Sequence, residues 1–403
     1  MTSKWFAPLL ILAAFSGWLA ASLFSGLTWL DTTTAIVQSS FLAALRMIIV
    51  PLIFFSLFSG VLQLRAAGAM GRLAGVTVAY YAFTSAIAIT IGLIVVFFIH
   101  PWTAYPPLAE IPPLSSGLID AEAGGVASLI GNLLNSMLVN PFSALAELNI
   151  LGVLTTALLF GSAAALTLPT NSRWPALLEE LTQTIYTCAR WVLTTLPLGI
   201  FAITYQLTDR IDLNTLVSLG HFAGVVFGAT AIHGVIVLPL IAWVLAGVTP
   251  LQLARAISQP VLTALMTSSS AATLPLSMTT AEEKLGVTRN KAAFVLPLGA
   301  TINMDGTALF EGIAVIFLAY MFGVQIDAGS VIIIFLITML ASAGAPGIPS
   351  GSMAGLQVIL LAVGIPLEAI GLLLLIERPL DTFRTAVNVE GDLVGALIAE
   401  KWS

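Results

Sequence analysis

The chain has 403 residues, of which 58% are hydrophobic and only 8% are charged, and its mean hydropathy is +1.03. Because a soluble domain carries roughly 25% charged residues, this composition predicts an integral membrane protein and excludes a cytosolic enzyme, a secreted disulfide scaffold and a disordered regulator. The net charge of −6 argues against nucleic acid as a partner, and the single cysteine, Cys188, excludes an intrachain disulfide.

Apolar runs of about 20 residues, long enough for a helix to cross a bilayer, occupy the first part of the chain. They lie near 6–27, 38–62, 74–99, 124–167, 181–206 and 213–247, and the fourth contains breaks. Because every backbone group within lipid must be paired and no alternating strand pattern is present, these runs predict helices.

Basic residues indicate how the chain is oriented. If the N-terminus is cytoplasmic, the inside segments hold nine basic residues and the outside segments hold Arg210 alone. The nine are Lys4, Arg65, Arg72, Arg173, Arg255, Lys284, Arg289, Lys291 and Lys401. By the positive-inside rule, we expect a multi-pass protein of the cell (inner) membrane with both termini in the cytoplasm and the proline-rich connection 100–123 outside.

After residue 248 the apolar stretches become shorter, and Ser, Gly and Pro interrupt them. They lie near 251–278, 290–323, 330–363 and 367–398. In the first and third, small polar residues separate two arms too short for a full crossing. These segments, around Thr267–Pro275 and Ser342–Gly351, predict re-entrant hairpins. A hairpin followed by an interrupted helix occurs twice, which is the weak internal repeat typical of a secondary transporter.

The last apolar stretch carries a polar stripe. At about 100° per residue, one helix face about 100° wide holds Glu377, Asp381, Arg384, Thr385, Asn388 and Asp392. Each charge near the bilayer centre costs about 2.5–3.5 kcal/mol, so these groups must face one another, water or a ligand. The stripe offers a carboxylate for an amine, a guanidinium for a carboxylate and oxygens for a small cation.

A second polar interruption, Asn303-Met304-Asp305-Gly306-Thr307, lies within the stretch near 290–323. Helix breaks at membrane depth are tolerated where they line a cavity, and their freed carbonyls bind Na⁺ in other transporters.

At these residues the sequence resembles the dicarboxylate/amino acid:cation symporter family, which includes glutamate and aspartate transporters. The strings RMIIVPLIFFSLFSG (46–60), SSSAATLP (268–275), GATINMDGTAL (299–309) and RTAVNVEGD (384–392) carry the resemblance. It implies an all-α fold of eight transmembrane helices plus two re-entrant hairpins, assembled as a homotrimer in lipid, and a protein that is not an enzyme.

The resemblance also implies a division into scaffold and transport domains. The scaffold would comprise 1–73, with the first two helices, and 124–212. The transport domain would comprise 74–123, with the third helix and the outer loop, and 213–403, with the hairpins and interrupted helices. Transport would follow an elevator-type alternating-access mechanism.

The residues that match the family motifs acquire expected roles. Asp381 would accept from the substrate amine beside Thr385, Arg384 would bind the side-chain carboxylate near Thr307, and Asn388 would hold the α-carboxylate. Ser270 and the backbone of the outer tip at Gly347 would assist. A planar guanidinium suits a carboxylate bidentately, which favours an acidic substrate.

For Na⁺, the resemblance implies three sites. The first would use Asp392, Asn388, Asn303 and the Gly299 carbonyl. The second would use the carbonyls of Thr301, Ser342, Ala343 and Ala345. The third would use Tyr81, Thr84, Ser85, Asn303 and Asp305, with the string YYAFTS (80–85) matching the family there.

Some positions depart from the family. Members commonly carry an arginine at the position of Ser268 or of Thr382, whereas here Arg378 is the candidate for that charge. Glu311 is an intramembrane glutamate and a candidate proton carrier, so coupling to H⁺ or K⁺ stays open.

The sequence therefore predicts a sodium-coupled importer of aspartate or glutamate. The alternative is a proton-coupled glutamate or C4-dicarboxylate symporter. A channel lacks a filter motif, and an intramembrane serine enzyme built on Ser269 or Ser270 lacks a nearby base in the sequence.

Overall fold

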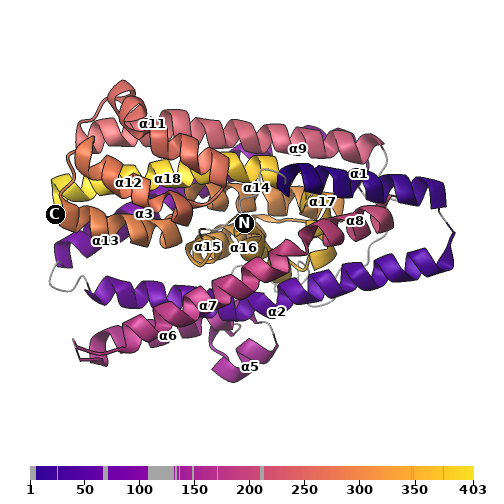
Figure 1. The fold of residues 1–403 in the computed structure, drawn as a ribbon, viewed down its shortest axis with the longest axis horizontal. Coiled ribbons are helices and arrows are strands. Elements are labelled where there is room, and N and C mark those ends of the chain that lie inside the picture. The colour runs from indigo at the N-terminus through magenta and orange to yellow at the C-terminus, as the bar shows by residue number, and fades with distance from the viewer. Residues whose placement is uncertain are drawn as a thin grey trace.

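The computed structural model describes residues 6–24, 26–66, 71–107, 131, 134–135, 137–147, 149–169, 171–208, 213–345, 347, 349–374 and 376–403. Throughout these ranges the regular structure is helical (Figure 1). The all-α prediction is therefore confirmed for this part of the chain. Most of the connection predicted over 100–123 lies outside the described residues, which there end at residue 107.

One group of helices comes from the N-terminal half. The long helix α2 (Thr28–Ala66) packs against three helices, namely α6 (Ile150–Thr167), α7 (Trp174–Thr194) and α8 (Leu196–Leu207). Helix α1 (Phe6–Phe24) packs along α8, and the short α5 (Pro141–Ala146) packs on α6. A methyl group added at Gly17 would lie 2.5 Å from the carbonyl oxygen of Phe201. This small residue therefore allows α1 and α8 to approach closely, as in many membrane helix pairs.

Helix α2 begins at Thr28, ten residues before the apolar run near 38–62 that predicted it. Its first turns are polar, and the hydroxyls of Thr32, Thr33 and Thr34 donate to carbonyls of the preceding turn. Hydropathy detects only the part of a helix that is apolar, so a polar helical extension escapes it.

A second group surrounds the C-terminal helix α18 (Glu377–Trp402), drawn in yellow in Figure 1. Its neighbours are α3 (Gly71–Phe98), α9 (Leu213–Ile232), α11 (Pro250–Thr267), α12 (Ser270–Glu283), α13 (Arg289–Ile302) and α14 (Asp305–Met321). Most of α18 is buried. The polar stripe on this helix is therefore covered by protein.

Helix α9 continues to Ala246 through two π-helical turns, His233–Val237 and Ala242–Ala246, which flank α10 (Leu238–Ile241). Pro239 lies between them and cannot donate a helical hydrogen bond. Wider turns beside a proline keep the helix continuous.

Two helix pairs stand where the sequence predicts hairpins. In the first, α11 ends at Thr267 and α12 begins at Ser270. In the second, α15 (Ala328–Ala343) and α16 (Ser352–Val363) are joined across residues 344–351. The arms have 18, 14, 16 and 12 residues, short of the roughly 20 needed to cross a bilayer.

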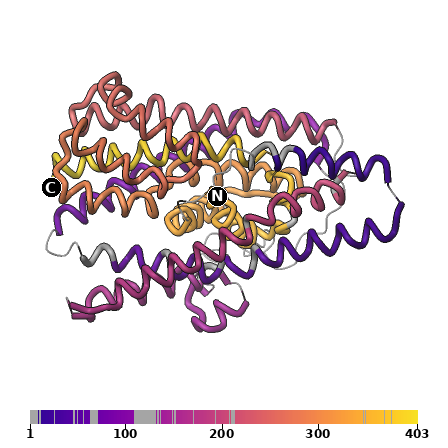
Figure 2. The backbone as a smooth tube through the Cα atoms, in the orientation of Figure 1, coloured from indigo at the N-terminus to yellow at the C-terminus, as the bar shows by residue number. Residues whose placement is uncertain are grey.

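The predicted interruptions are present too. Asn303 and Met304 separate α13 from α14, and α17 (Ile370–Leu374) ends shortly before α18 begins. Figure 2 draws the same backbone as a tube, with the C-terminal helix α18 in yellow.

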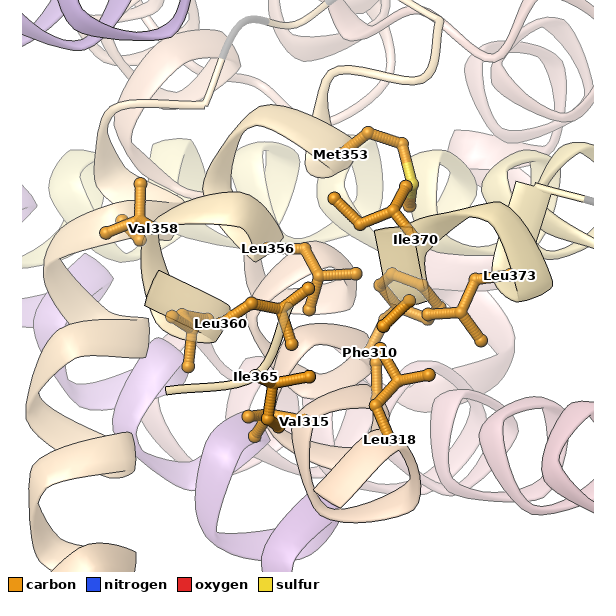
Figure 3. Close-up of a cluster of buried hydrophobic side chains, with 14 of the residues drawn as sticks. Phe310, Val315, Leu318, Met353, Leu356, Val358, Leu360, Ile365, Ile370 and Leu373 are labelled. Carbon is orange, nitrogen blue, oxygen red and sulfur yellow. The ribbon is translucent and has the colours of Figure 1, made fainter. Parts of the chain in front are cut away.

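A buried apolar cluster supports the second hairpin (Figure 3). It joins Phe310, Val315 and Leu318 of α14 to residues of α16, of α17 and of the segment between them. These last are Met353, Leu356, Val358, Leu360, Ile365, Ile370 and Leu373. The second arm of this hairpin therefore packs on α14.

By length and composition, three helical segments in the described ranges suffice to cross a membrane: Gly71–Ala104, Leu213–Ala246 and Arg289–Met321. The pair Trp174–Val192 and Leu196–Gln206, bent by 47°, makes a fourth. The predicted number of eight spans stays a prediction. Large apolar side chains such as Leu12, Phe98 and Leu159 are exposed on the outer surface, as a lipid-facing surface requires.

Candidate functional site

A small polar pocket lies where the two hairpin tips, the break between α13 and α14, and helix α18 meet. Its empty volume is about 220 Å³, including open solvent. The lining residues are Ser268, Ser270, Met304, Thr307, Gly347, Gly351, Ser352, Asp381, Thr385 and Asn388. One carboxylate, one amide and several hydroxyls therefore face a space suited to a small polar molecule.

The structure brings together six of the seven predicted substrate residues around this pocket; the exception is Arg384. Asn388 is fixed in orientation, because its Oδ1 accepts from the Gly306 amide at 2.7 Å and its Nδ2 donates to Thr307 Oγ1 at 3.3 Å. The Thr385 hydroxyl donates to the Asp381 carbonyl at 2.8 Å.

The two hairpin tips are joined directly. The Gly347 carbonyl of the outer tip accepts from the Ser269 hydroxyl at 2.8 Å and from the Ala271 amide at 3.1 Å. Ser269 also caps the start of α12, since its hydroxyl accepts from the Ala272 amide. The inner tip is therefore held against the outer one by its own helix cap.

Sequence reasoning missed several lining residues. Gly351 ends the predicted outer tip, Ser352 follows it, and Met304 lies inside the predicted break. The Ser268 and Ser352 hydroxyls are buried and have no hydrogen-bond partner among the described residues. Buried hydroxyls of this kind are open to a ligand. Polar residues next to a predicted helix end were the available signal.

Arg384 is buried beside the pocket rather than in its lining. Its Nη2 donates to Glu377 Oε1 at 2.8 Å and to Asp381 Oδ1 at 3.1 Å. The guanidinium carbon lies 3.9 Å from the ring centroid of Phe310, a cation–π contact. Nε and Nη1 of Arg384 have no partner among the described residues.

Arg378 lies on the same charged cluster. Its Nη1 is 3.6 Å from Asp381 Oδ2. That Arg378 supplies the charge otherwise missing at Ser268 and Thr382 stays a prediction.

At the first predicted cation site, Asn303 Nδ2 donates to Asp392 Oδ1 at 3.0 Å. A methyl group at Gly299 would clash with Asp392 Oδ1, so the glycine lets this carboxylate approach α13. The Asn388 side chain instead forms hydrogen bonds with Gly306 and Thr307, and no hydrogen bond joins it to Asp392 among the described residues.

At the third predicted cation site, Ser85 Oγ donates to Asp305 Oδ1 at 2.8 Å and Thr84 Oγ1 donates to Asn303 Oδ1 at 3.3 Å. The Tyr81 hydroxyl donates to the Val295 carbonyl at 2.8 Å. Three helices, α3, α13 and α14, therefore gather side-chain oxygens around the helix break.

His233 joins this site, which sequence reasoning did not foresee. Its Nε2 lies 3.3 Å from Asp305 Oδ2, and both side chains are buried. A lone histidine in an apolar run gave no signal of such a contact. Among the described residues, no group of three or more His, Cys, Asp or Glu side chains is placed to bind a metal ion.

The second predicted cation site would use backbone carbonyls where α13 and α15 are in contact. The Ser342 carbonyl accepts from the Ala345 amide at 3.1 Å. Thr301 also lines a larger cavity of about 1120 Å³, including open solvent, between α2, α7 and the inner tip. Ala343 ends α15. The arrangement leaves this ion site a prediction.

Glu311 is fully buried on α14, and neither of its carboxylate oxygens has a partner among the described residues. It is packed against Gly355 of α16, where an added methyl group would clash with it. A carboxyl group in such surroundings is suited to carrying a proton rather than a permanent charge.

Comparison with known proteins covers nearly the whole chain. The sequence model of the Sodium:dicarboxylate symporter family matches residues 6–402. An excitatory amino acid transporter of Caenorhabditis elegans is 33% identical over 404 residues, covering 89% of this chain and 79% of that protein. Human neutral amino acid transporter A is 32% identical over 394 residues, covering 88% and 73%. Mouse excitatory amino acid transporter 3 is 30% identical over 404 residues, covering 89% and 77%.

Proposed function

Because this chain belongs to the sodium:dicarboxylate symporter family, we propose that it imports an acidic amino acid, aspartate or glutamate, together with Na⁺. Membership of this family makes the chain a multi-pass, cation-coupled membrane symporter and not an enzyme. Asp381 binds the substrate amine, Asn388 holds the α-carboxylate, and Arg384 recognises the side-chain carboxylate.

One observation carries this proposal. The carboxylate of Asp381 lines the pocket, and Arg384 lies 3.1 Å from it with two guanidinium nitrogens unpartnered. A hydrogen-bond acceptor for an amine therefore lies beside a guanidinium that can donate to a carboxylate, as an amino acid with a second carboxylate requires.

The proposed Na⁺ sites draw support from the oxygens gathered at the helix break. Asp305, Asn303 and Ser85 supply them in a water-poor interior, and hard cations prefer such ligands. The ions neutralise Asp305 and Asp392, which have no arginine or lysine partner in the described structure.

The proposed movement follows from the two groups of helices. The group around α2 is the scaffold, and the group around α18 carries the pocket and moves as a unit. The exposed apolar surface of the scaffold helices suits assembly into a homotrimer. By the positive-inside rule, both termini lie in the cytoplasm.

The proposal is tested by thermal unfolding of the purified protein in detergent, in NaCl or choline chloride, with L-aspartate, L-glutamate, succinate or L-serine. A ligand that binds the folded state raises stability by RT ln(1 + [L]/Kd). We expect a shift with L-aspartate or L-glutamate that appears only in Na⁺.

The other outcomes contradict parts of the proposal. A shift with L-serine alone would show a neutral substrate, as the name of the human relative indicates for that protein. A shift with succinate, or one indifferent to Na⁺, would favour the proton-coupled alternative, in which Glu311 is the proton carrier.

A further inference from the structure

A closed ring of hydrogen bonds joins the outer hairpin to α18. Each of the two carboxylates, Glu377 and Asp381, gives one oxygen to Arg384 Nη2, at 2.8 and 3.1 Å. The other oxygen of each carboxylate accepts from Ser350 at 2.9 Å. Ser350 uses its hydroxyl for Glu377 and its backbone amide for Asp381. The ring is buried, so its members have little access to water as an alternative partner.

Ser350 has an unusual backbone conformation. Its φ is +60°, in the left-handed region that few residues other than glycine adopt. Such a conformation costs free energy and persists where surrounding contacts determine it. Here the two bonds to carboxylates, which are among the stronger hydrogen bonds in proteins, supply those contacts.

The ring leaves the empty site electrically balanced. Arg384 and Arg378 carry two positive charges, and Glu377 and Asp381 carry two negative charges, all within 3.6 Å of a partner of opposite sign. An unbalanced charge is costly at membrane depth. With no substrate bound, Arg384 pairs with the carboxylate of Glu377 in place of a substrate carboxylate.

We propose that Ser350 is a positioning residue that holds the outer hairpin closed over the empty site, and so permits the substrate-free carrier to return across the membrane. This inference rests on the proposed symport function. A symporter completes its cycle only if the empty site closes and returns, whereas exchange of internal for external substrate omits that step.

With substrate bound, the outer hairpin depends less on the ring to stay closed. The substrate amine meets Asp381, and the substrate itself bridges the pocket between α18 and the hairpin tips. Loss of the Ser350 hydroxyl therefore weakens the closed empty state more than the closed loaded state. The Glu377 carboxylate is then left with Arg384 alone.

The experiment uses the full protein in liposomes and measures two activities. Net uptake of radiolabelled L-aspartate, with L-serine in parallel, is driven by a Na⁺ gradient into vesicles without internal substrate. Exchange is measured into vesicles loaded with the same unlabelled amino acid. For Ser350→Ala we expect net uptake to fall about fivefold or more, since a bond to a charged group is lost, while exchange stays within about twofold.

Two variants accompany it. Ser350→Gly adopts a positive φ without strain but lacks the hydroxyl, so it loses net uptake as Ser350→Ala does. Thr338→Val removes a buried, unpartnered hydroxyl from the first arm of the same hairpin and leaves both activities unchanged. Folding of each variant is checked by its thermal unfolding temperature.

Equal losses of net uptake and exchange in Ser350→Ala would overturn the proposal, because they indicate a binding or folding defect. An unchanged net uptake would also overturn it. If the unaltered protein performs neither activity with either amino acid, the proposed function itself fails, which is a distinct result.

Discussion

At the scale of single residues, the charges around Arg384 determine what the pocket selects. The guanidinium lies over the Phe310 ring and donates to two carboxylates. Its Nε and Nη1 remain without partners. An acidic substrate that reaches Arg384 must therefore use these donors or displace Glu377, and a neutral substrate need do neither.

We expect Arg384→Ala to weaken L-aspartate binding at least about tenfold, because a charge-assisted interaction is lost. The variant also leaves Glu377 beside Asp381 without their common cation, and removing one partner of a buried ion pair costs about 3–5 kcal/mol. Thermal unfolding without ligand and L-aspartate titration measure the two effects separately.

The double variant Arg384→Ala with Glu377→Gln serves as the control. It removes the carboxylate that Arg384→Ala leaves without a cation, while Asp381 keeps its contact with Arg378, so it regains much of the stability and none of the affinity for L-aspartate. If Arg384→Ala alone bound L-aspartate normally, Arg384 would not be the specificity residue.

At the scale of secondary structure, the helix ends hold the hairpins in place. Asp327 caps the first helix of the outer hairpin, α15, because its Oδ1 accepts from the Ser330 amide at 2.7 Å and the Ser330 hydroxyl at 2.6 Å. It lies outside the membrane-spanning segments. The hydrogen bonds from the hydroxyl and then the amide of Ser330 lower the pKa of this carboxyl group.

A lowered pKa in the folded state means that ionised Asp327 stabilises the fold above its unfolded pKa, which is about 3.9. The contribution is lost as the pH falls through the folded value. We expect the unfolding temperature of the unaltered protein to exceed that of Asp327→Asn at pH 7, with a difference that shrinks toward zero below about pH 4.

The asparagine variant keeps a good helix cap without the charge, so it isolates the ionisation. Asp327→Ala, which loses the cap as well, remains less stable than the unaltered protein at every pH. A pH-independent difference for Asp327→Asn would show that the charge of Asp327 plays no part.

At the scale of the whole molecule, the group of helices around α2 packs beside the group around α18, with α2 in contact with α13. A methyl group at Gly344, next to α15, would lie 3.8 Å from Ile53 Cγ2 of α2. This contact joins the proposed scaffold to the proposed transport domain. If the proposed transport domain moves against the proposed scaffold, these two positions must separate during the cycle.

We therefore expect that Hg²⁺ crosslinks the pair Ile53→Cys and Gly344→Cys, in a background with Cys188→Ala. Uptake in liposomes should stop and recover on addition of a thiol, while ligand-induced thermal stabilisation persists. The two single-cysteine variants are the controls and stay active in Hg²⁺. Undiminished uptake in the crosslinked protein would refute the proposed movement.

Much of this architecture followed from the sequence alone. Composition determined the membrane class, since a chain with 8% charged residues cannot cover a soluble surface. The spacing of Asp381, Thr385 and Asn388 placed them on one face of α18, because the period of a helix is local and constant. Small polar residues between short apolar arms indicated both hairpins.

Only the tertiary structure decided which side chains from different elements meet. The period of a helix does not predict that Arg384 binds Glu377 or that Ser350 binds Glu377 as well. Nor does it predict the contact between His233 and Asp305, which are 72 positions apart in the chain. Those contacts depend on how α9, α14, α18 and the outer hairpin pack against one another. How helices pack depends on the shapes of many side chains together, so no single motif predicts it.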